Sequence, residues 1–137
     1  MMITNERQYG ITKNKLQKLE ESLLTTPPAN LPEALQTAMT AGIRAKIQDL
    51  QLELETYEKL KKSTQLSISA LDDLPEALIK VRIMRGITQK QLAEKLGVKE
   101  QQVQRDEAEN YARAKIDKLI RIGKALGIEV QGTLSLR

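Results

Sequence analysis

The sequence has no cysteine, no histidine, no tryptophan and no phenylalanine, and its aromatic residues are three tyrosines. Without cysteine or histidine the chain can form no disulfide, no zinc site of the Cys/His type and no nucleophile activated by an imidazole. Its carboxylates are not gathered into one set, and three tyrosines are too few to stack the bases of a single strand. We therefore expect a binding protein that is not an enzyme, with no catalytic residues, no metal site and no cofactor.

Long apolar runs are missing as well. No stretch approaches the roughly 20 apolar residues of a membrane-spanning helix, and the N-terminus lacks the basic and then apolar pattern of a signal sequence. We expect a cytoplasmic protein with no membrane partner. The net charge of +4 and the pI near 9.3 suit a polyanionic partner, although many other proteins carry such a charge.

What is present favours a mainly α-helical fold. The chain has 137 residues, 40% of them hydrophobic and 29% charged, which is typical of a folded protein. It is rich in Leu, Ile, Ala, Gln, Glu and Lys, most of which are good helix formers. A stretch rich in Ser and Thr interrupts the helical pattern. We therefore divide the chain into a helical segment at 1–62, a linker at 63–70 that has the pattern of a short strand, and a second domain at 71–137.

The N-terminal segment shows two runs of apolar residues at spacings of three and four, which predict two amphipathic helices. The stripe of the first helix is Tyr9, Thr12, Leu16, Leu19 and Leu23. The stripe of the second helix is Ile43, Ile47, Leu50, Leu54 and Tyr57. Pro27 and Pro28 should end the first helix before they are reached, and Pro32 should begin the second.

Each stripe needs a partner, because one amphipathic helix cannot bury its own face. The two helices can cover each other as an antiparallel hairpin, or the long helix can form a coiled coil with a second copy. The second stripe runs for only about two and a half heptads, and a free-standing coiled coil needs about three or four. We favour the hairpin, with room for a dimer contact on top of it, and expect this segment to serve dimerisation or partner binding.

Helical periodicity returns in the second domain, with clear start and stop signals. Pro75 is placed at the start of a helix that ends at Gly86. Thr88 and Gln91 have the spacing of a capping box, in which each side chain bonds the backbone amide of the other residue. They predict a second helix over Gln89–Leu96.

A sharp turn should follow this second helix. Gly97 can take the positive-φ conformation that redirects the chain, small Ala93 lets two helices cross closely, and Val103 fills the angle between them. A third helix should open near Glu100. This joint spacing is that of a helix-turn-helix, whose second helix enters the major groove of DNA.

The stretch from Leu78 to Ile128, with the segments GITQKQLAEKLGV and LIRIGKALGI, resembles the Xre/Cro-type helix-turn-helix family of prokaryotic and phage regulators, some of which are antitoxins. The resemblance implies a compact, lambda-repressor-like bundle of short helices that binds operator DNA as a dimer. It leaves the N-terminal half of the chain outside.

The resemblance also implies roles for single residues. The residues implied to read base edges are Glu100, Gln101, Arg105 and, at the margin, Gln104. Gln89 and, at the edge of the interface, Lys99 would contact phosphates. Arg82 and Glu107 match a partly buried ion pair that ties the first helix of the domain to the end of the third.

The chemistry of these residues fits such roles. On a helix packed through Val103, positions 100, 101, 104 and 105 point away from the core. An arginine can bond guanine through two nitrogens, a glutamine can bond adenine, and a glutamate can accept from the amino group of cytosine. Lys90 lies beside the amides that begin the second helix, and Arg113 and Lys115 lie in the loop before a fourth, so we expect these three to contact phosphates.

Three residues depart from the family pattern. Lys99 stands where a Ser or Thr usually caps the third helix, Asp106 replaces an apolar or aromatic residue, and Glu109 replaces a glycine. Together with Glu107, the two acids would weaken DNA binding unless they face away from the phosphates. They motivate the alternative that the chain is a protein-interaction module that keeps the fold without specific DNA binding.

Residues 128–136 alternate between apolar and polar like a β-strand, and so do residues 66–68. Because a single strand needs an edge with which to pair, we predict a small sheet, either within one chain or across a dimer. The family more often has a fifth helix here, so the resemblance does not supply the dimer interface.

The sequence thus predicts a sequence-specific transcription regulator, a repressor that binds a palindrome in double-stranded DNA as a homodimer. A finer hypothesis is that the chain is the antitoxin of a toxin–antitoxin pair, whose N-terminal half binds the toxin protein.

Overall fold

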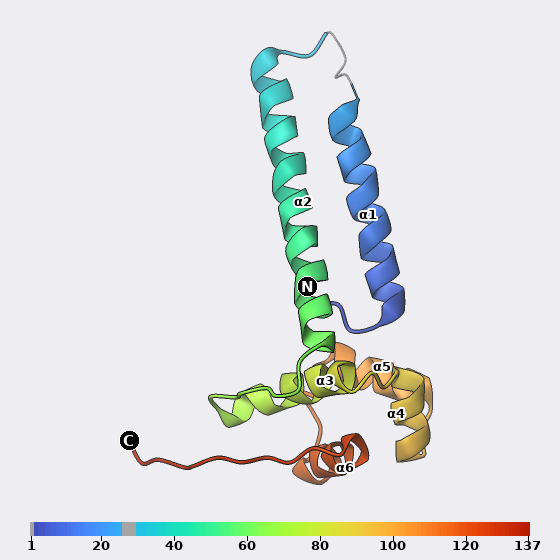
Figure 1. Ribbon diagram of the computed structural model, residues 1–137, viewed down its shortest axis with the longest axis vertical. Helices are drawn as coiled ribbons and strands as arrows, with labels where there is room; N and C mark the ends of the chain where they lie inside the picture. The colour runs from blue at the N-terminus through green and yellow to red at the C-terminus, as the bar shows by residue number, and fades with distance from the viewer. Residues whose placement is uncertain (1, 26–29) are drawn as a thin grey trace. The chain divides into compact units, whose positions relative to one another are not determined.

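The computed structural model describes residues 2–25 and 30–137. The chain divides into two compact units, unit 1 (Met1–Leu60) and unit 2 (Lys61–Arg137), which are described one at a time. The described residues form helices, turns and extended segments, with no strand among them (Figure 1). None of the described helices combines the length and the apolar character that crossing a membrane requires.

Unit 1 consists of two long helices, α1 (Glu6–Leu24) and α2 (Glu33–Lys61), that run in opposite directions (Figure 1). The side chain of Asn5 caps α1 by accepting a hydrogen bond from the amide of Gln8 at 2.8 Å. Pro32 directly precedes α2, as the sequence indicates. The predicted stop at Pro27 and Pro28 lies outside the described residues.

Side chains from both helices meet near the start of α1. The rings of Tyr9 and Tyr57 lie with their centroids 5.2 Å apart. The hydroxyl of Tyr57 donates to the carboxylate of Glu6 at 3.0 Å, and that of Tyr9 donates to Glu58. The hydrogen bond to Glu58 raises the pKa of Tyr9 above its usual value. These contacts join α1 to α2 at one end of the pair.

The buried side chains of unit 1 gather in the same half of the pair. They are Ile3, Thr12, Ile47, Leu50, Leu54 and Tyr57. The other half exposes apolar groups instead, because Leu24, Leu35 and Met39 are each at least 46% exposed. A coiled coil with a second copy stays a prediction.

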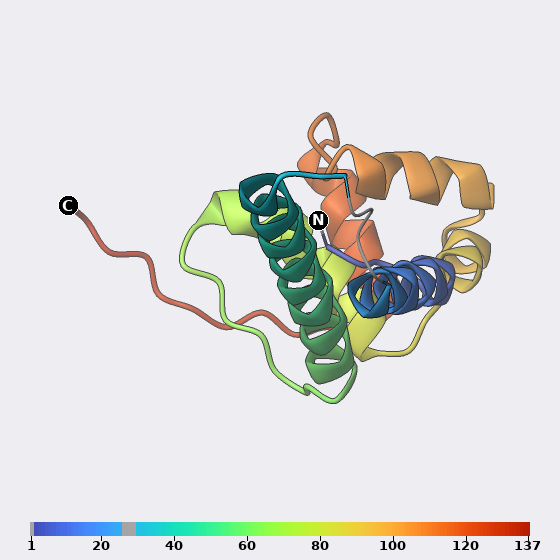
Figure 2. The ribbon, with the colours of Figure 1, turned by 90° about the horizontal axis from the view of Figure 1, so that it is seen from above.

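Unit 2, all of which the structure describes, is a bundle of short helices (Figures 1 and 2). Its elements are the 3-10 turn η1 (Leu71–Asp73) and the helices α3 (Leu74–Met84), α4 (Gln89–Leu96), α5 (Glu100–Ala108) and α6 (Ile116–Leu126). Helix α4 packs on α5 and α6, and α3 packs on α6. The most deeply buried side chains of the bundle include Leu78, Leu92, Val103, Ile122 and Leu126.

The local signals of the sequence place these helices. Pro75 lies in the first turn of α3, and Gly86 follows that helix with φ of 69°. The capping box before α4 is complete, because the amide of Gln91 bonds Oγ1 of Thr88 at 3.0 Å and the amide of Thr88 bonds Oε1 of Gln91 at 2.9 Å. Each of these signals acts on the backbone at one end of a helix only. It therefore fixes where that helix begins or ends.

The sheet predicted within one chain is wrong. Residues 128–137 and 65–68 have no strand or helix assignment, and no backbone hydrogen bond joins the two described segments. Instead, the amide of Ile128 bonds the carbonyl of Gly123 at 3.1 Å, which completes the end of α6. Alternation shows only which side chains can share a face, and an edge must still be present for the strand to pair.

Candidate nucleic-acid interface

The turn between α4 and α5 is set by Gly97. This residue has φ of 71°, in the left-handed region that favours glycine. The amide of Val98 then bonds the carbonyl of Ala93 at 3.0 Å, and the amide of Gly97 bonds Glu94 at 3.3 Å. These bonds satisfy the last carbonyls of α4 and turn the chain sharply into α5.

Helix α5 presents two different faces. Val103 and Glu107 are buried on the side that packs on the rest of the bundle. All four residues predicted to read bases are exposed: Glu100, Gln101, Gln104 and Arg105. The burial of one face holds the backbone in place, so the exposed face is presented as a rigid surface.

A buried polar network fixes the far end of α5. Arg82 on α3 contacts Glu107 twice, with Nε to Oε2 at 2.6 Å and Nη2 to Oε1 at 2.8 Å. Its Nη1 also donates to the carbonyl of Ile87 at 2.9 Å. A bidentate arginine–carboxylate contact of this kind has a defined geometry, so it sets the position of α5 relative to α3.

Gln89 belongs to the same network. Its Nε2 donates to Oε1 of Glu107 at 2.9 Å, and the residue is only 6% exposed. The structure therefore places the side chain implied to contact a phosphate on the buried carboxylate of α5. Sequence reasoning missed this contact, although a buried glutamate that pairs with one arginine still has lone pairs to satisfy.

Residues 78–132 match the family model described as helix-turn-helix. Unit 2 carries an Xre-type helix-turn-helix domain. The match runs from within α3 to beyond α6 and leaves unit 1 outside. The comparisons with curated proteins and with solved structures found no match. Helix-turn-helix domains of this type occur in DNA-binding regulators.

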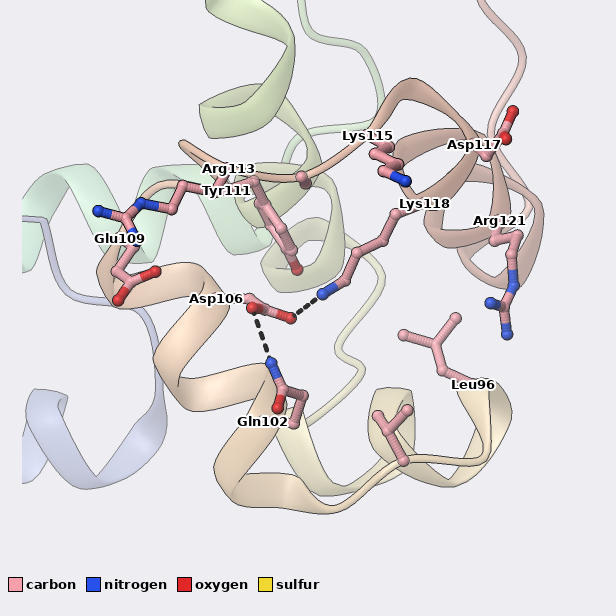
Figure 3. Close-up of a pocket in the computed structure, with 12 residues that line it drawn as sticks. Leu96, Gln102, Asp106, Glu109, Tyr111, Arg113, Lys115, Asp117, Lys118 and Arg121 are labelled. Carbon is pink, nitrogen blue, oxygen red and sulfur yellow. Dashed lines mark hydrogen bonds and ion pairs between the residues drawn. The ribbon is translucent and has the colours of Figure 1, made fainter.

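Two of the three acids near the end of α5, Asp106 and Glu107, are compensated inside unit 2. Oδ2 of Asp106 lies 2.6 Å from Nζ of Lys118 on α6, and Oδ1 accepts from Nε2 of Gln102 at 3.0 Å (Figure 3). The side chain of Asp106 is 16% exposed. Glu107 is buried against Arg82, so only Glu109 is exposed. The acids of α5 would therefore repel phosphate less than the sequence alone suggests.

The loop between α5 and α6 is held by Tyr111. Asn110 and Tyr111 have φ of 54° and 52°, which non-glycine residues adopt at a cost of about 1–2 kcal/mol each. Burial of the Tyr111 ring offsets this cost, because the residue is 5% exposed and points into the space between α5 and α6 (Figure 3). Burial, followed by the charge of Glu107, raises the pKa of Tyr111 above its usual range.

The predicted phosphate contacts other than Gln89 lie at the surface. Lys90 is exposed in the first turn of α4, and Lys99 is exposed just before α5. Arg113 and Lys115 are exposed in the loop that Tyr111 holds. The sequence predicted these cations but not the roles of Tyr111, which holds the loop, and Lys118, which pairs with Asp106. Nothing in the sequence pattern singled out either residue.

Proposed function

We propose that this protein is a sequence-specific double-stranded DNA-binding regulator of transcription that reads base edges with the exposed face of α5. The observation that carries the proposal is the contrast between the two faces of this helix. Val103 and Glu107 hold one face, and four polar side chains suited to base edges occupy the other: Glu100, Gln101, Gln104 and Arg105.

Phosphates on either side of the groove would be contacted by exposed cations. Lys90 and Lys99 border α4 and α5, and Arg113 and Lys115 lie in the loop before α6. These four charges outnumber the exposed acids at the two ends of α5, Glu100 and Glu109, which supports attraction to a polyanion. Gln89 acts indirectly in this proposal, because its side chain is bonded to Glu107 and places α5.

We propose further that the protein acts as a repressor and binds a palindromic operator as a dimer. One short helix offers few base contacts, so a single domain would bind with modest affinity. Two domains whose recognition helices lie about 34 Å apart reach successive major grooves on one face of the duplex, and linking them multiplies their affinities. A dimer seated on a promoter blocks polymerase without any further activity.

The test is DNA binding to the region upstream of the gene, measured by gel shift with single alanine variants. We expect Arg105→Ala and Gln101→Ala to weaken specific binding by roughly 10-fold or more, since each good base contact contributes about 1–3 kcal/mol. Lys124→Ala is the matched control, because Lys124 is an exposed cation in the last turn of α6 with no proposed DNA role. Binding that neither of the first two changes weakens would refute the site assignment.

The alternative of a protein-interaction module without DNA binding rests on the acidic residues of α5. The ion pair of Asp106 with Lys118 and the burial of Glu107 remove most of that support. Failure of the wild-type protein to shift upstream DNA at low salt, where phosphate contacts are strongest, would favour this alternative.

A role as the antitoxin of a toxin–antitoxin pair is a finer proposal, favoured by unit 1. This unit lies outside the helix-turn-helix match and exposes apolar side chains at Leu35 and Met39, which would suit a protein partner. We expect a neighbouring reading frame to encode a growth inhibitor that this protein neutralises. Leu35→Asp with Met39→Asp should abolish rescue of growth and leave DNA binding unchanged; rescue by the double variant would count against this partner surface.

A further inference from the structure

The C-terminal segment, residues 128–136, carries apolar side chains at every second position except Gly132. Ile128 is half buried against Gly123 at the end of α6. Beyond it the side chains have little cover: Val130 is 67% exposed, Leu134 is 94% exposed and Leu136 is fully exposed. Figure 2 shows this part of the chain as an extended trace that leaves the helices of unit 2. A row of exposed apolar side chains on one face of an extended segment is unfavourable in water.

The beginning of the segment borders a groove within unit 2. The groove is lined by the linker at Leu66–Ile68, by α3 and by residues 128–131. Leu66 and Ile68 are each more than a third exposed there, and Val81 of α3 also lines the groove. The groove therefore offers apolar side chains beside the backbone of the C-terminal segment.

The backbone of the segment also has capacity to pair. Within the described part of the chain, residues 129–137 make no hydrogen bond to another backbone group. Extended backbone with unused donors and acceptors is a template for a strand from another chain. An extended partner segment would therefore cover the exposed side chains and also bond the backbone of residues 129–137.

The sequence of the segment makes a second copy the fitting partner. When two copies pair antiparallel about a two-fold axis at Gly132, Val130 of each lies opposite Leu134 of the other, and Ile128 lies opposite Leu136. Every apolar residue then falls on one face, and the polar pairs fall on the opposite face. A slip by one residue would set apolar residues against polar ones, and a slip by two would set Gly132 against Val130 or Leu134. Only the register centred on Gly132 pairs all four apolar residues with one another.

Gly132 suits the crossing point. No other described atom lies within 4 Å of the place where its Cβ would be, so nothing in its own chain obstructs an approaching strand. A residue on the axis faces its own copy in the partner, and two hydrogen atoms there allow the closest approach.

We propose that two copies of this protein dimerise through residues 128–136, paired antiparallel about Gly132, with Leu134 and Leu136 of each copy covering the groove of the other. The groove and the register agree, because Ile128 and Val130 line the groove and are the residues opposite those two leucines. The inference deepens the proposed function, since it rests on DNA binding by a dimer and names the surface that joins the two domains.

Single-cysteine cross-linking tests the register directly, because the natural chain contains no cysteine. Gly132→Cys should give a cross-linked dimer with a short thiol cross-linker, since opposite residues of paired strands have Cβ atoms about 5 Å apart. Ser135→Cys is the matched control, because its two copies would lie about 20 Å apart along the strands. Equal cross-linking at both sites, or none at Gly132→Cys, would overturn the proposal.

Sedimentation tests the apolar face. Leu134→Asp with Leu136→Asp should raise the dimer dissociation constant by at least about 100-fold, because buried leucines are lost on both sides of the axis. Thr133→Lys with Ser135→Lys adds charge of the same size on the opposite face, where position 135 lies opposite Glu129 of the partner subunit, and should leave the dimer intact. A wild-type protein that sediments as a monomer at micromolar concentration, or two double variants that dissociate alike, would overturn the proposal.

Binding to a duplex with one half-site separates this proposal from the proposed function. A monomeric double variant that still shifts the half-site shows that DNA reading by α5 is intact and that the lost contact is the dimer interface. If the wild type shifts the half-site while remaining a monomer, the dimerisation proposal fails and the DNA-binding proposal stands.

Discussion

Units 1 and 2 are both helical, but they are held together in different ways. Unit 2 has short helices whose ends are marked by a capping box at Thr88 and by glycines at positive φ, and a buried network around Glu107 joins three of its segments. Unit 1 has two long helices whose described cross-contacts lie at one end, at Tyr9 and Tyr57, while apolar side chains at the other end are exposed.

The comparison shows what each kind of signal determines. Caps and positive-φ glycines act on single residues, so they fix helix ends and the angle between helices even in a short chain. An apolar stripe determines only that a helix has a face to bury, and it leaves the partner open. The arrangement of the helices in unit 2 is therefore determined by local signals in its own sequence. In unit 1, a partner that covered the exposed apolar half would add the most stability.

The largest effect that separates the units is expected from Glu107→Ala. Removal of this carboxylate leaves Arg82 buried without its ion-pair partner, which should lower the free energy of unfolding of unit 2 by about 3–5 kcal/mol. Hydrogen–deuterium exchange resolved by peptide should show faster exchange in unit 2 and unchanged exchange in unit 1. The double variant Arg82→Met with Glu107→Leu, which removes both charges, should lose much less stability; a loss as large as that of Glu107→Ala would contradict this account.

The same contrast explains how much could be predicted from the sequence. The bounds of α4 follow from Thr88, Gln91 and Gly97, and the structure has them as the sequence predicts. The partners of Gln89 and Asp106 did not follow, because a side chain at the surface of one helix can turn to several neighbours and only the assembled bundle selects one. The prediction of a sheet within one chain was wrong for the same reason. The alternation in 128–136 indicates which side chains share a face, but it does not indicate the strand edge with which the segment would pair.

Substitution of glycine by alanine, made at one position in each unit, is expected to change stability by a smaller amount and with opposite sign in the two units. Gly97→Ala places a Cβ at φ of 71°, which should cost about 1–2 kcal/mol and disturb the turn. Gly42→Ala, in the middle of α2, should stabilise unit 1 by about 0.5–1 kcal/mol, because alanine loses less backbone entropy in a helix. Apart from the chain neighbours and the backbone of its own helix, no described atom lies within 4 Å of either added Cβ, so backbone conformation decides both results.

Chemical denaturation of each variant, followed by circular dichroism and peptide-resolved exchange, measures this pair. The changes should appear in different units, with Gly97→Ala also weakening DNA binding because α5 is aimed by the turn. Stabilisation by both substitutions would mean that the positive φ at Gly97 is not required, and the turn would then have to be held by side-chain packing instead.

The smallest effect concerns Lys99, where stability and function should move in opposite directions. Its backbone is extended, with φ of −78° and ψ of 147°, as a helix cap requires, yet within the described part of the chain its side chain makes no capping bond to α5. Lys99→Ser should add that bond and stabilise unit 2 by about 0.5–1 kcal/mol, while removal of a phosphate contact lowers the salt dependence of DNA binding by about one unit of slope.

Lys99→Ala separates the two contributions, because it removes the same charge without offering a cap. Both variants should show the same reduced salt slope, and only Lys99→Ser should melt at a higher temperature. Equal melting temperatures would show that α5 gains nothing from a capped start, so its position would depend on Glu107 and Val103 alone. An unchanged salt slope in both variants would place Lys99 outside the DNA interface and confine the phosphate contacts before α5 to Lys90.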